Sequence, residues 1–148
     1  LMIRVYCDIV GDLFHVGHLN LFKKAREYGT HLIVGIHSDS TVESYKRKPI
    51  FCEEDRYELI SNCRLVNEIV KDAPLHISID FIREHNIDVV VHGDDPSPHF
   101  MEQHKVPLEL GIMKYTPYTQ GISTSDIIKR LRHTYFCINE SLFDMEKL

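Results

Sequence analysis

The chain has 148 residues, 43% of them hydrophobic, and its 17 lysines and arginines stand against 22 aspartates and glutamates for a formal net charge of −5. This length suffices to bury roughly 68–70% of the surface of the unfolded chain without a metal or disulfide staple. No window approaches the roughly 20 apolar residues of a membrane helix, and the cations are dispersed. We therefore expect one soluble globular domain with no stable membrane insertion and no nucleic-acid partner.

The chain ends and the cysteines add further expectations. The N-terminal Leu1-Met2-Ile3-Arg4 has no signal-peptide pattern, so we expect an intracellular, cytoplasmic protein. The cysteines are widely scattered without a C-x-x-C pair, which argues against a zinc site and a disulfide framework; they are Cys7, Cys52, Cys63 and Cys137. We divide the chain into a ligand-binding domain at 1–136 and a C-terminal tail or short helix at 137–148.

Strand-like and helix-like segments alternate along the chain. In chain order, the pattern predicts a strand at 3–7, a helix at 17–28, a strand at 31–37, a helix at 53–63, a strand at 66–70, a short helix at 80–85, strands at 87–91 and 112–116, and a helix at 124–135. This alternation is typical of an α/β fold, a Rossmann-like three-layer sandwich with a mainly parallel five-stranded sheet. Its ligand crevice is expected outside the carboxyl ends of the strands, where the connecting loops lie at 8–18, 38–52, 92–98 and 117–123.

The first of these loops, 8–18, places His15 and His18 three residues apart at the start of a predicted helix. Imidazoles and free backbone N–H groups at a helix N-terminus form an anion site, which Gly17 keeps accessible. Two polar residues that only cap the helix are the plainer alternative. A metal site at these histidines would lack its third and fourth ligands, so we assign no metal to protein ligands here.

The other loops carry charge and hydroxyl groups to the same edge of the sheet. Lys46-Arg47-Lys48 is either solvated surface charge or a cationic lid over phosphate oxygens. Asp94 and Asp95 follow a buried strand and either form a turn or bind ligand hydroxyls, amines or a cation-bridged phosphate. The last loop, 121–126, offers hydroxyls and N–H groups to a phosphate and also fits a helix cap made by Ser123.

Two of these stretches resemble a known family. Asp12-Leu13-Phe14-His15-Val16-Gly17-His18 and Gly121-Ile122-Ser123-Thr124-Ser125 are similar to the two signatures of the cytidylyltransferase branch of the nucleotidyltransferase superfamily. Similar stretches at 45–49, 54–57, 63–66 and 92–95 extend the resemblance over about residues 3 to 135. H-x-G-H alone would indicate only the superfamily, which also contains adenylyltransferases, and the phosphate loop of P-loop hydrolases is absent from the sequence.

The resemblance implies that residues 1–136 are a nucleotide-binding catalytic domain that takes CTP and a phosphorylated alcohol. CMP would pass to the alcohol's phosphate, releasing pyrophosphate, and Mg²⁺ would come with the nucleotide. By resemblance the catalytic residues are His15, His18 and Lys46, although an alignment gap would put Lys48 in place of Lys46. The other implied positions are the nucleotide-binding Val10, Gly11, Asp12, Gly17, Gly121, Ile122, Ser123 and Thr124, and the substrate or supporting residues Asp94, Asp95, Arg56 and Arg64.

The chain departs from the family pattern at three places. Tyr118 stands where the family usually has an arginine, Ile9-Val10-Gly11 replaces a motif that begins with glycine, and Leu75 stands where an aromatic choline site would have tryptophan. We therefore rank phosphoethanolamine before glycerol 3-phosphate and phosphocholine. The alternatives are an adenylyltransferase of the same superfamily and a catalytically weakened nucleotide-binding relative. Relatives are commonly dimers, and Arg64 with the segment 66–68 resembles their contact region, so we expect a homodimer.

Overall fold

The computed structural model describes residues 1–94 and 98–136, so Asp95 and the segment 137–148 lie outside the described residues. Five strands form one sheet: β1 (Arg4–Ile9), β2 (His31–Ile36), β3 (Glu68–Lys71), β4 (Val89–Gly93) and β5 (Met113–Thr116). Their order is β3-β2-β1-β4-β5, and every neighbouring pair is parallel. The expected Rossmann-like sandwich is confirmed, with a sheet that is parallel throughout rather than mainly so.

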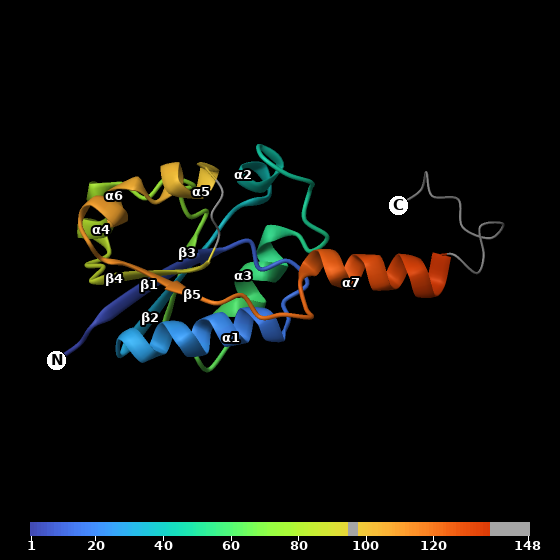
Figure 1. Cartoon of the computed structure of the whole chain (residues 1–148), viewed down its shortest axis with the longest axis horizontal. Helices are drawn as coiled ribbons and strands as arrows, with labels where there is room; N and C mark the ends of the chain where they lie inside the picture. The colour runs from blue at the N-terminus through green and yellow to red at the C-terminus, as the bar shows by residue number, and fades with distance from the viewer. Residues whose placement is uncertain (95–97, 137–148) are drawn as a thin grey trace.

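Helices cover both faces of this sheet (Figure 1). They are α1 (Val16–Ala25) with the 3-10 turn η1 (Arg26–Tyr28), α2 (Asp39–Glu43), α3 (Glu53–Ser61), α4 (Ile79–Glu84), α5 (Pro98–Gln103), α6 (Lys105–Glu109), and α7 (Thr124–Leu131) with the π-helical turn η2 (Arg132–Phe136). Because strand side chains alternate, β1 buries Val5 and Cys7 against Phe22 of α1 and Ile60 of α3 on one face. On the other face it buries Tyr6.

The second face has its own apolar core. There Tyr6 packs at 5.2 Å, ring centroid to ring centroid, against Phe81 of α4, in a cluster that also holds Ile33, Ile82 and Val90. The two cores sandwich a sheet whose central strands are almost wholly buried. Such burial on both faces explains the continuous apolar runs of the central strands.

Three short helices were not predicted from the sequence. α2 lies within the polar stretch 38–52 and begins because the Ser38 side chain accepts a hydrogen bond from the Thr41 N–H. α5 and α6 follow β4, and α5 begins at Pro98, whose missing N–H and fixed φ suit the first turn of a helix. Helices of five or six residues are too short to show a hydrophobic period, which is why the pattern did not reveal them.

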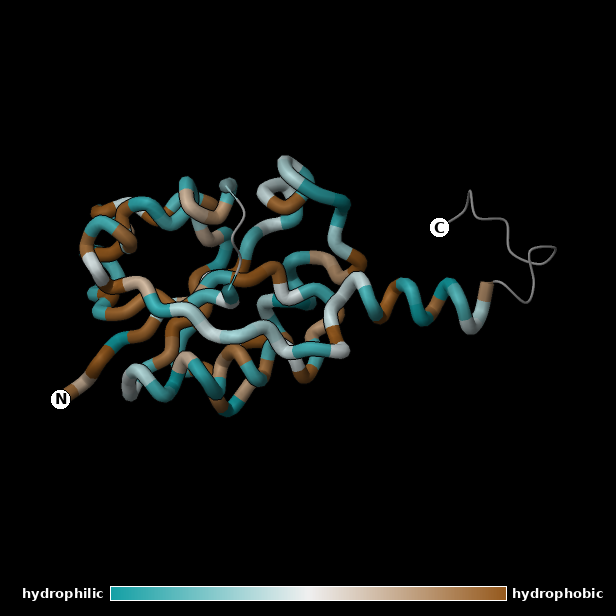
Figure 2. The backbone as a smooth tube through the Cα atoms, viewed as in Figure 1, coloured by the Kyte–Doolittle hydropathy of each residue, from teal (hydrophilic) through white to brown (hydrophobic). Residues whose placement is uncertain are grey.

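The last helix extends away from the body of the fold (Figure 1). Every residue of α7 is half-buried or exposed, and apolar and polar residues alternate along it (Figure 2). The helix ends at Leu131 and continues as the π-helical turn η2 rather than as the uninterrupted helix to Tyr135 that the sequence predicts. Within the described residues, no helix has the length and apolar character needed to cross a membrane.

Candidate active site

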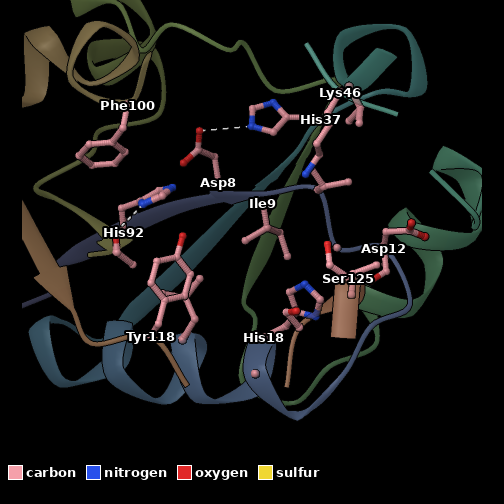
Figure 3. A pocket seen from close by; sticks show the side chains of 18 of the residues that line it. Asp8, Ile9, Asp12, His18, His37, Lys46, His92, Phe100, Tyr118 and Ser125 are labelled. Atoms are coloured by element: carbon pink, nitrogen blue, oxygen red, sulfur yellow. Dashed lines mark hydrogen bonds and ion pairs between the residues drawn. The ribbon is translucent and has the colours of Figure 1, made fainter. Parts of the chain in front are cut away.

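A cavity of about 940 Å³ opens at the carboxyl ends of the strands, where the sequence places the ligand crevice. Its walls come from the segments after β1, β2, β4 and β5, together with α5 and the start of α7. Figure 3 shows two groups of side chains in it: His18, Asp12 and Ser125 near one end, and Asp8, His37, His92 and Phe100 near the other. Ile9 lies between the two groups.

His15 and His18 hold each other at the N-terminus of α1. The Gly17 N–H donates to Nδ1 of His15 at 3.0 Å, and the His15 N–H donates to Nδ1 of His18 at 3.1 Å, a reciprocal capping box. Because each Nδ1 accepts, the proton of each neutral imidazole is on Nε2. The helix cap that the sequence offered is therefore observed, and because it uses Nδ1 of each histidine it leaves each Nε2–H available as a donor, which is compatible with the predicted anion site.

The two imidazoles are neutral at ordinary pH. Burial lowers the pKa of His15. Burial, and then the neighbouring His15 and Lys46, lower the pKa of His18 to about 4 against the opposing pull of Asp12. The ring centroids are 3.9 Å apart, so protonation of both rings would place two cations in contact. Neutral Nε2–H groups beside a helix N-terminus are suited to receive phosphate oxygens.

Gly17 is needed for the position of the His15 ring. A Cβ atom at Gly17 would lie 2.7 Å from Cε1 and 2.9 Å from Nδ1 of His15. Any larger residue would therefore displace the His15 imidazole from the hydrogen bond that caps α1. Glycine is thus needed here to make room for the ring, in addition to keeping the backbone accessible.

Asp12 anchors the cationic loop to the first motif. Its buried carboxylate accepts from the backbone N–H groups of Ile50 and Phe51, both at 2.9 Å, and lies 3.4 Å from Arg47. Its carbonyl oxygen accepts from the Thr124 hydroxyl at 2.8 Å, which ties the start of α7 to the same loop. Asp12 thus lines the cavity and positions the segments around it.

Lys46 and Arg47 line the cavity, and Lys48 is outside its lining. Of the two lysines left open by the sequence, Lys46 therefore shares the cavity lining with the histidines, and its catalytic role stays a prediction. Partial desolvation of its ammonium, reinforced by the Arg47 charge, lowers the pKa of Lys46. A cationic side chain at the rim, opposite two neutral histidines, gives this end of the cavity the donors that an anionic ligand requires.

The structure separates the expected supporting residues from the cavity. Arg56 is fully buried and donates to the carbonyls of Val10 at 2.6 Å and His37 at 2.7 Å, so it braces two loops from behind. Arg64 is exposed before β3, and Asp94 is exposed beyond β4; both are outside the cavity lining. The role of Arg64 and Asp94 as substrate-binding or supporting residues stays a prediction.

The loop before α7 caps that helix and lines the cavity, as the sequence indicates. Ser123 caps α7 by accepting from the Asp126 N–H at 3.0 Å, and it lines the cavity together with Ile122 and Thr124. Gly121 has φ +82° and forms the turn into this loop outside the lining. Val10, Gly11 and Gly17 also line the cavity, as expected for nucleotide-binding positions.

Tyr118 reaches the cavity from the segment after β5 (Figure 3). Its ring lies against Gly93, where an added Cβ would come within 3.2 Å of it. A phenol at this place supplies one hydroxyl in place of the charged fork of an arginine.

A buried polar cluster at the other end of the cavity was not predicted. Asp8 is 5% exposed, with Oδ2 at 3.3 Å from Nε2 of His37 and Oδ1 at 3.4 Å from Nε2 of His104. Burial alone would raise the pKa of Asp8, but the hydrogen bonds to His104 and His37 outweigh it and hold that pKa far below its usual value. For His37, burial is likewise outweighed by Asp8, and its pKa is raised. Residues so far apart in sequence leave no spacing pattern to recognise.

A parallel sheet covered on both faces, with a cavity and a helix N-terminus at the strand carboxyl ends, is the architecture of three-layer α/β proteins. The family model described as cytidylyltransferase-like matches residues 12–130. The chain belongs to this family.

Relatives of the chain share its sequence over most of its length. It is 39% identical to choline-phosphate cytidylyltransferase A of Rattus norvegicus over an alignment of 137 residues. The alignment covers 90% of this chain and 37% of the relative. It is 41% identical to ethanolamine-phosphate cytidylyltransferase of Dictyostelium discoideum over an alignment of 133 residues, and that alignment covers 86% of this chain and 37% of the relative. The chain thus spans just over a third of the length of these curated relatives.

Solved structures share the fold. The lipopolysaccharide core biosynthesis protein from Thermoplasma volcanium GSS1 superposes with a TM-score of 0.64 and 29% identity, over 80% of this chain and 98% of that one. Pantothenate synthetase from Thermus thermophilus superposes with a TM-score of 0.56 over 86% of this chain and 61% of that one, and its 13% identity makes this a likeness of fold alone.

Proposed function

We propose that the chain transfers CMP from CTP to a phosphorylated alcohol, giving a CDP-alcohol and pyrophosphate. The observation that carries this proposal is the pair of neutral imidazoles, His15 and His18, whose Nδ1 atoms are occupied by the capping box and whose Nε2–H groups remain as donors beside Lys46. Membership of the cytidylyltransferase-like family supports the choice of CTP over ATP.

In the proposed reaction, a phosphate oxygen of the alcohol forms a bond to the α-phosphorus of CTP as the bond to the β-phosphate bridging oxygen breaks. Pyrophosphate leaves with that electron pair, and no covalent enzyme intermediate is required. Such a reaction depends on positioning and on stabilisation of negative charge. His15 and His18 would donate hydrogen bonds to the phosphate oxygens, and Lys46 would clamp them from the opposite rim.

Mg²⁺ is proposed to accompany the nucleotide, where it would neutralise charge on the phosphates. Among the described residues, the carboxylates that line the cavity are Asp8, Asp12 and Glu102. Asp12 already accepts hydrogen bonds from two backbone N–H groups, and Asp8 is paired with histidines. Among the described residues, the end of the cavity near His15 and His18 therefore has no cluster of unpaired carboxylates that would bind Mg²⁺. The triphosphate oxygens would be its main ligands.

Phosphoethanolamine is the alcohol we propose to test first, followed by glycerol 3-phosphate and phosphocholine. The relatives are named for choline and ethanolamine phosphates. Leu75 lines the cavity and the chain contains no tryptophan, which weakens a quaternary-ammonium site. Asp94 is exposed and outside the cavity lining, so an ammonium contact to it stays a prediction.

Pyrophosphate release tests the proposal with CTP or ATP, Mg²⁺ and each of the three phosphorylated alcohols. The matched variants are His18→Ala and His133→Ala, the second at an exposed histidine in η2. Release with CTP and one alcohol that is lost in His18→Ala and kept in His133→Ala supports the proposal. Release with ATP alone would assign an adenylyltransferase instead.

Silence across the panel would favour the weakened nucleotide-binding relative, for which Tyr118 is the specific observation. Tyr118→Arg then restores a bidentate cation at the cavity. Turnover that appears only in this variant would identify the chain as a nucleotide-binding protein that has lost catalysis.

A homodimer is proposed through the edge of the sheet that carries β3. Within the described part of the chain, this strand is at the edge of the sheet and pairs with β2, and its residues Glu68, Ile69 and Val70 are half-buried. Arg64, expected at this contact, is exposed beside it. A sedimentation mass equal to one chain at micromolar concentration would refute the dimer. The cytoplasmic location stays a prediction.

A further inference from the structure

Arg47 is a cation of the loop after α2 whose hydrogen-bond donors are mostly unused. Its side chain is 47% exposed and lines the cavity together with Asp12 and His18. Nη1 donates at 3.4 Å to Oδ2 of Asp12 and at 3.5 Å to the carbonyl of Lys48. Within the described part of the chain, Nε and Nη2 make no hydrogen bond. Because a guanidinium has five N–H donors, Arg47 can offer a fork of donors to a ligand in the cavity.

The Asp12 carboxylate is held in place without Arg47. It is buried, and each of its oxygens accepts a hydrogen bond from a backbone N–H of the loop at 2.9 Å. A hydrogen bond between a guanidinium and a carboxylate is ordinarily about 2.7–2.9 Å long. The ion pair between Arg56 and Asp39 has this length, at 2.7 Å, whereas Arg47 lies 3.4 Å from Asp12. Arg47 can therefore leave this loose contact without stranding an unpaired buried carboxylate.

The backbone on both sides of Arg47 is anchored. Before it, the Lys46 N–H donates to the carbonyl of Val42 in α2 at 3.0 Å. After it, the Ile50 N–H donates to the Asp12 carboxylate. This leaves the long side chain of Arg47, rather than the loop, as the part that can turn from Asp12 to a ligand.

The charges around Arg47 favour an anionic ligand. Lys46 precedes Arg47 and lines the same cavity. Burial, and then the Arg47 charge, lower the pKa of Lys46, so the two neighbouring cations oppose each other. The Nε2–H of His18 is a donor at the same end of the cavity, which Figure 3 shows together with Asp12. An anion with several oxygens would accept from all three side chains and relieve the repulsion between the two cations.

We propose that Arg47 binds the β- and γ-phosphates of CTP, giving up its contact with Asp12 for a bidentate contact with phosphate oxygens. This inference rests on the proposed function, because it takes CTP as the nucleotide. In the proposed reaction those two phosphates depart as pyrophosphate, so Arg47 would bind the leaving group. A planar fork matches the spacing of phosphate oxygens, which the single ammonium of a lysine does not.

Equilibrium binding separates this role from turnover. Calorimetry with the whole chain, Mg²⁺ and no alcohol measures the affinities for CTP, CMP and inorganic pyrophosphate. Arg47→Met should weaken the binding of CTP and pyrophosphate by about 10–100-fold and leave that of CMP unchanged, because CMP has no β- or γ-phosphate. Arg47→Lys, which keeps the charge and loses the fork, should recover only part of the affinity.

Arg83→Met is the matched control, at an exposed arginine of α4 outside the cavity lining, and should bind each ligand as the wild type does. Thermal melting establishes that each variant is folded, and Arg47→Lys decides the matter if Arg47→Met is not. A wild type that binds no CTP would overturn the proposed function and this inference together. If the wild type binds CTP, an affinity that is unchanged in Arg47→Met, or weakened equally for CTP and CMP, would overturn the role of Arg47 alone. Full recovery in Arg47→Lys would overturn the bidentate contact.

Discussion

The side-chain hydroxyl of Thr124 donates a 2.8 Å hydrogen bond to the backbone carbonyl of Asp12. These residues belong to the two sequence motifs, which the chain separates by 112 positions. The bond fixes the start of α7 against the loop that follows β1, while the Asp12 carboxylate holds the cationic loop. One residue pair therefore joins three of the segments that line the cavity.

Thr124→Val should lower the free energy of unfolding by about 1 kcal/mol, because the Asp12 carbonyl loses its partner without a change in side-chain shape. It should also reduce the increase in melting temperature that CTP produces, since α7 is no longer hydrogen-bonded to the loop after β1. Urea unfolding and CTP titrations monitored by melting temperature measure both effects. Thr134→Val, at an exposed threonine, is the control and should change neither.

Arg56→Met should destabilise the fold by about 3 kcal/mol, since it leaves the half-buried carbonyl of Val10 and the buried carbonyl of His37 without their donor. Arg56→Lys should recover only part of this loss, because an ammonium cannot reproduce the planar fork. Denaturant unfolding checks the prediction against Arg132→Met, at an exposed arginine. A loss no larger than that of Arg132→Met would show that the buried guanidinium does not brace these loops.

The depressed pKa of His18 predicts a pH dependence of stability. Its pKa falls from 6.5 to about 4 on folding, mainly through burial, so between these values the unfolded chain binds a proton that the folded chain does not. The contribution of His18 to stability is therefore complete above pH 6.5 and is lost as the pH falls toward 4, by about 3 kcal/mol.

His18→Gln isolates this contribution, because glutamine at the same helix position can still accept from the His15 N–H and keep the capping box. As the pH falls from 7 to 4, the wild type should lose stability relative to His18→Gln, because only the wild type has this histidine to protonate on unfolding. Unfolding curves at several pH values between 4 and 7 measure it. A difference that does not vary with pH would contradict the pKa of His18.

Gly17→Ala should lower turnover about 10–100-fold while leaving stability nearly unchanged. The added methyl group meets the His15 ring, with Cε1 2.7 Å from the ideal Cβ position, and displaces an imidazole that the proposed reaction needs in place. The measurements are pyrophosphate release, the NMR shifts of the His15 ring and denaturant unfolding. Val16→Ala, at the exposed neighbouring position, should retain full turnover. An unmoved His15 ring in Gly17→Ala would contradict the steric argument whether or not the protein is active.

Hydrophobic patterning and local motifs were enough to predict the frame of this protein. The apolar run Leu32-Ile33-Val34 indicates a strand buried on both faces, and each strand of the parallel sheet was anticipated with its ends within two residues of those observed. The H-x-G-H segment predicts the anion site at the start of α1, because a helix cap is a local property of consecutive residues.

The tertiary structure alone decided which side chains meet across the cavity. Pairing of β1 with β4, and the packing of α5 and α6 over their carboxyl ends, brings Asp8 to His92 and His104 across as many as 96 positions. Arg64 and Asp94 are exposed although they lie in stretches that resemble the family's. The sequence by itself determines local periodicity and helix caps, because these act within one or two helical turns. A cluster of polar residues that are distant in sequence depends on strand order and register, which only the folded chain establishes.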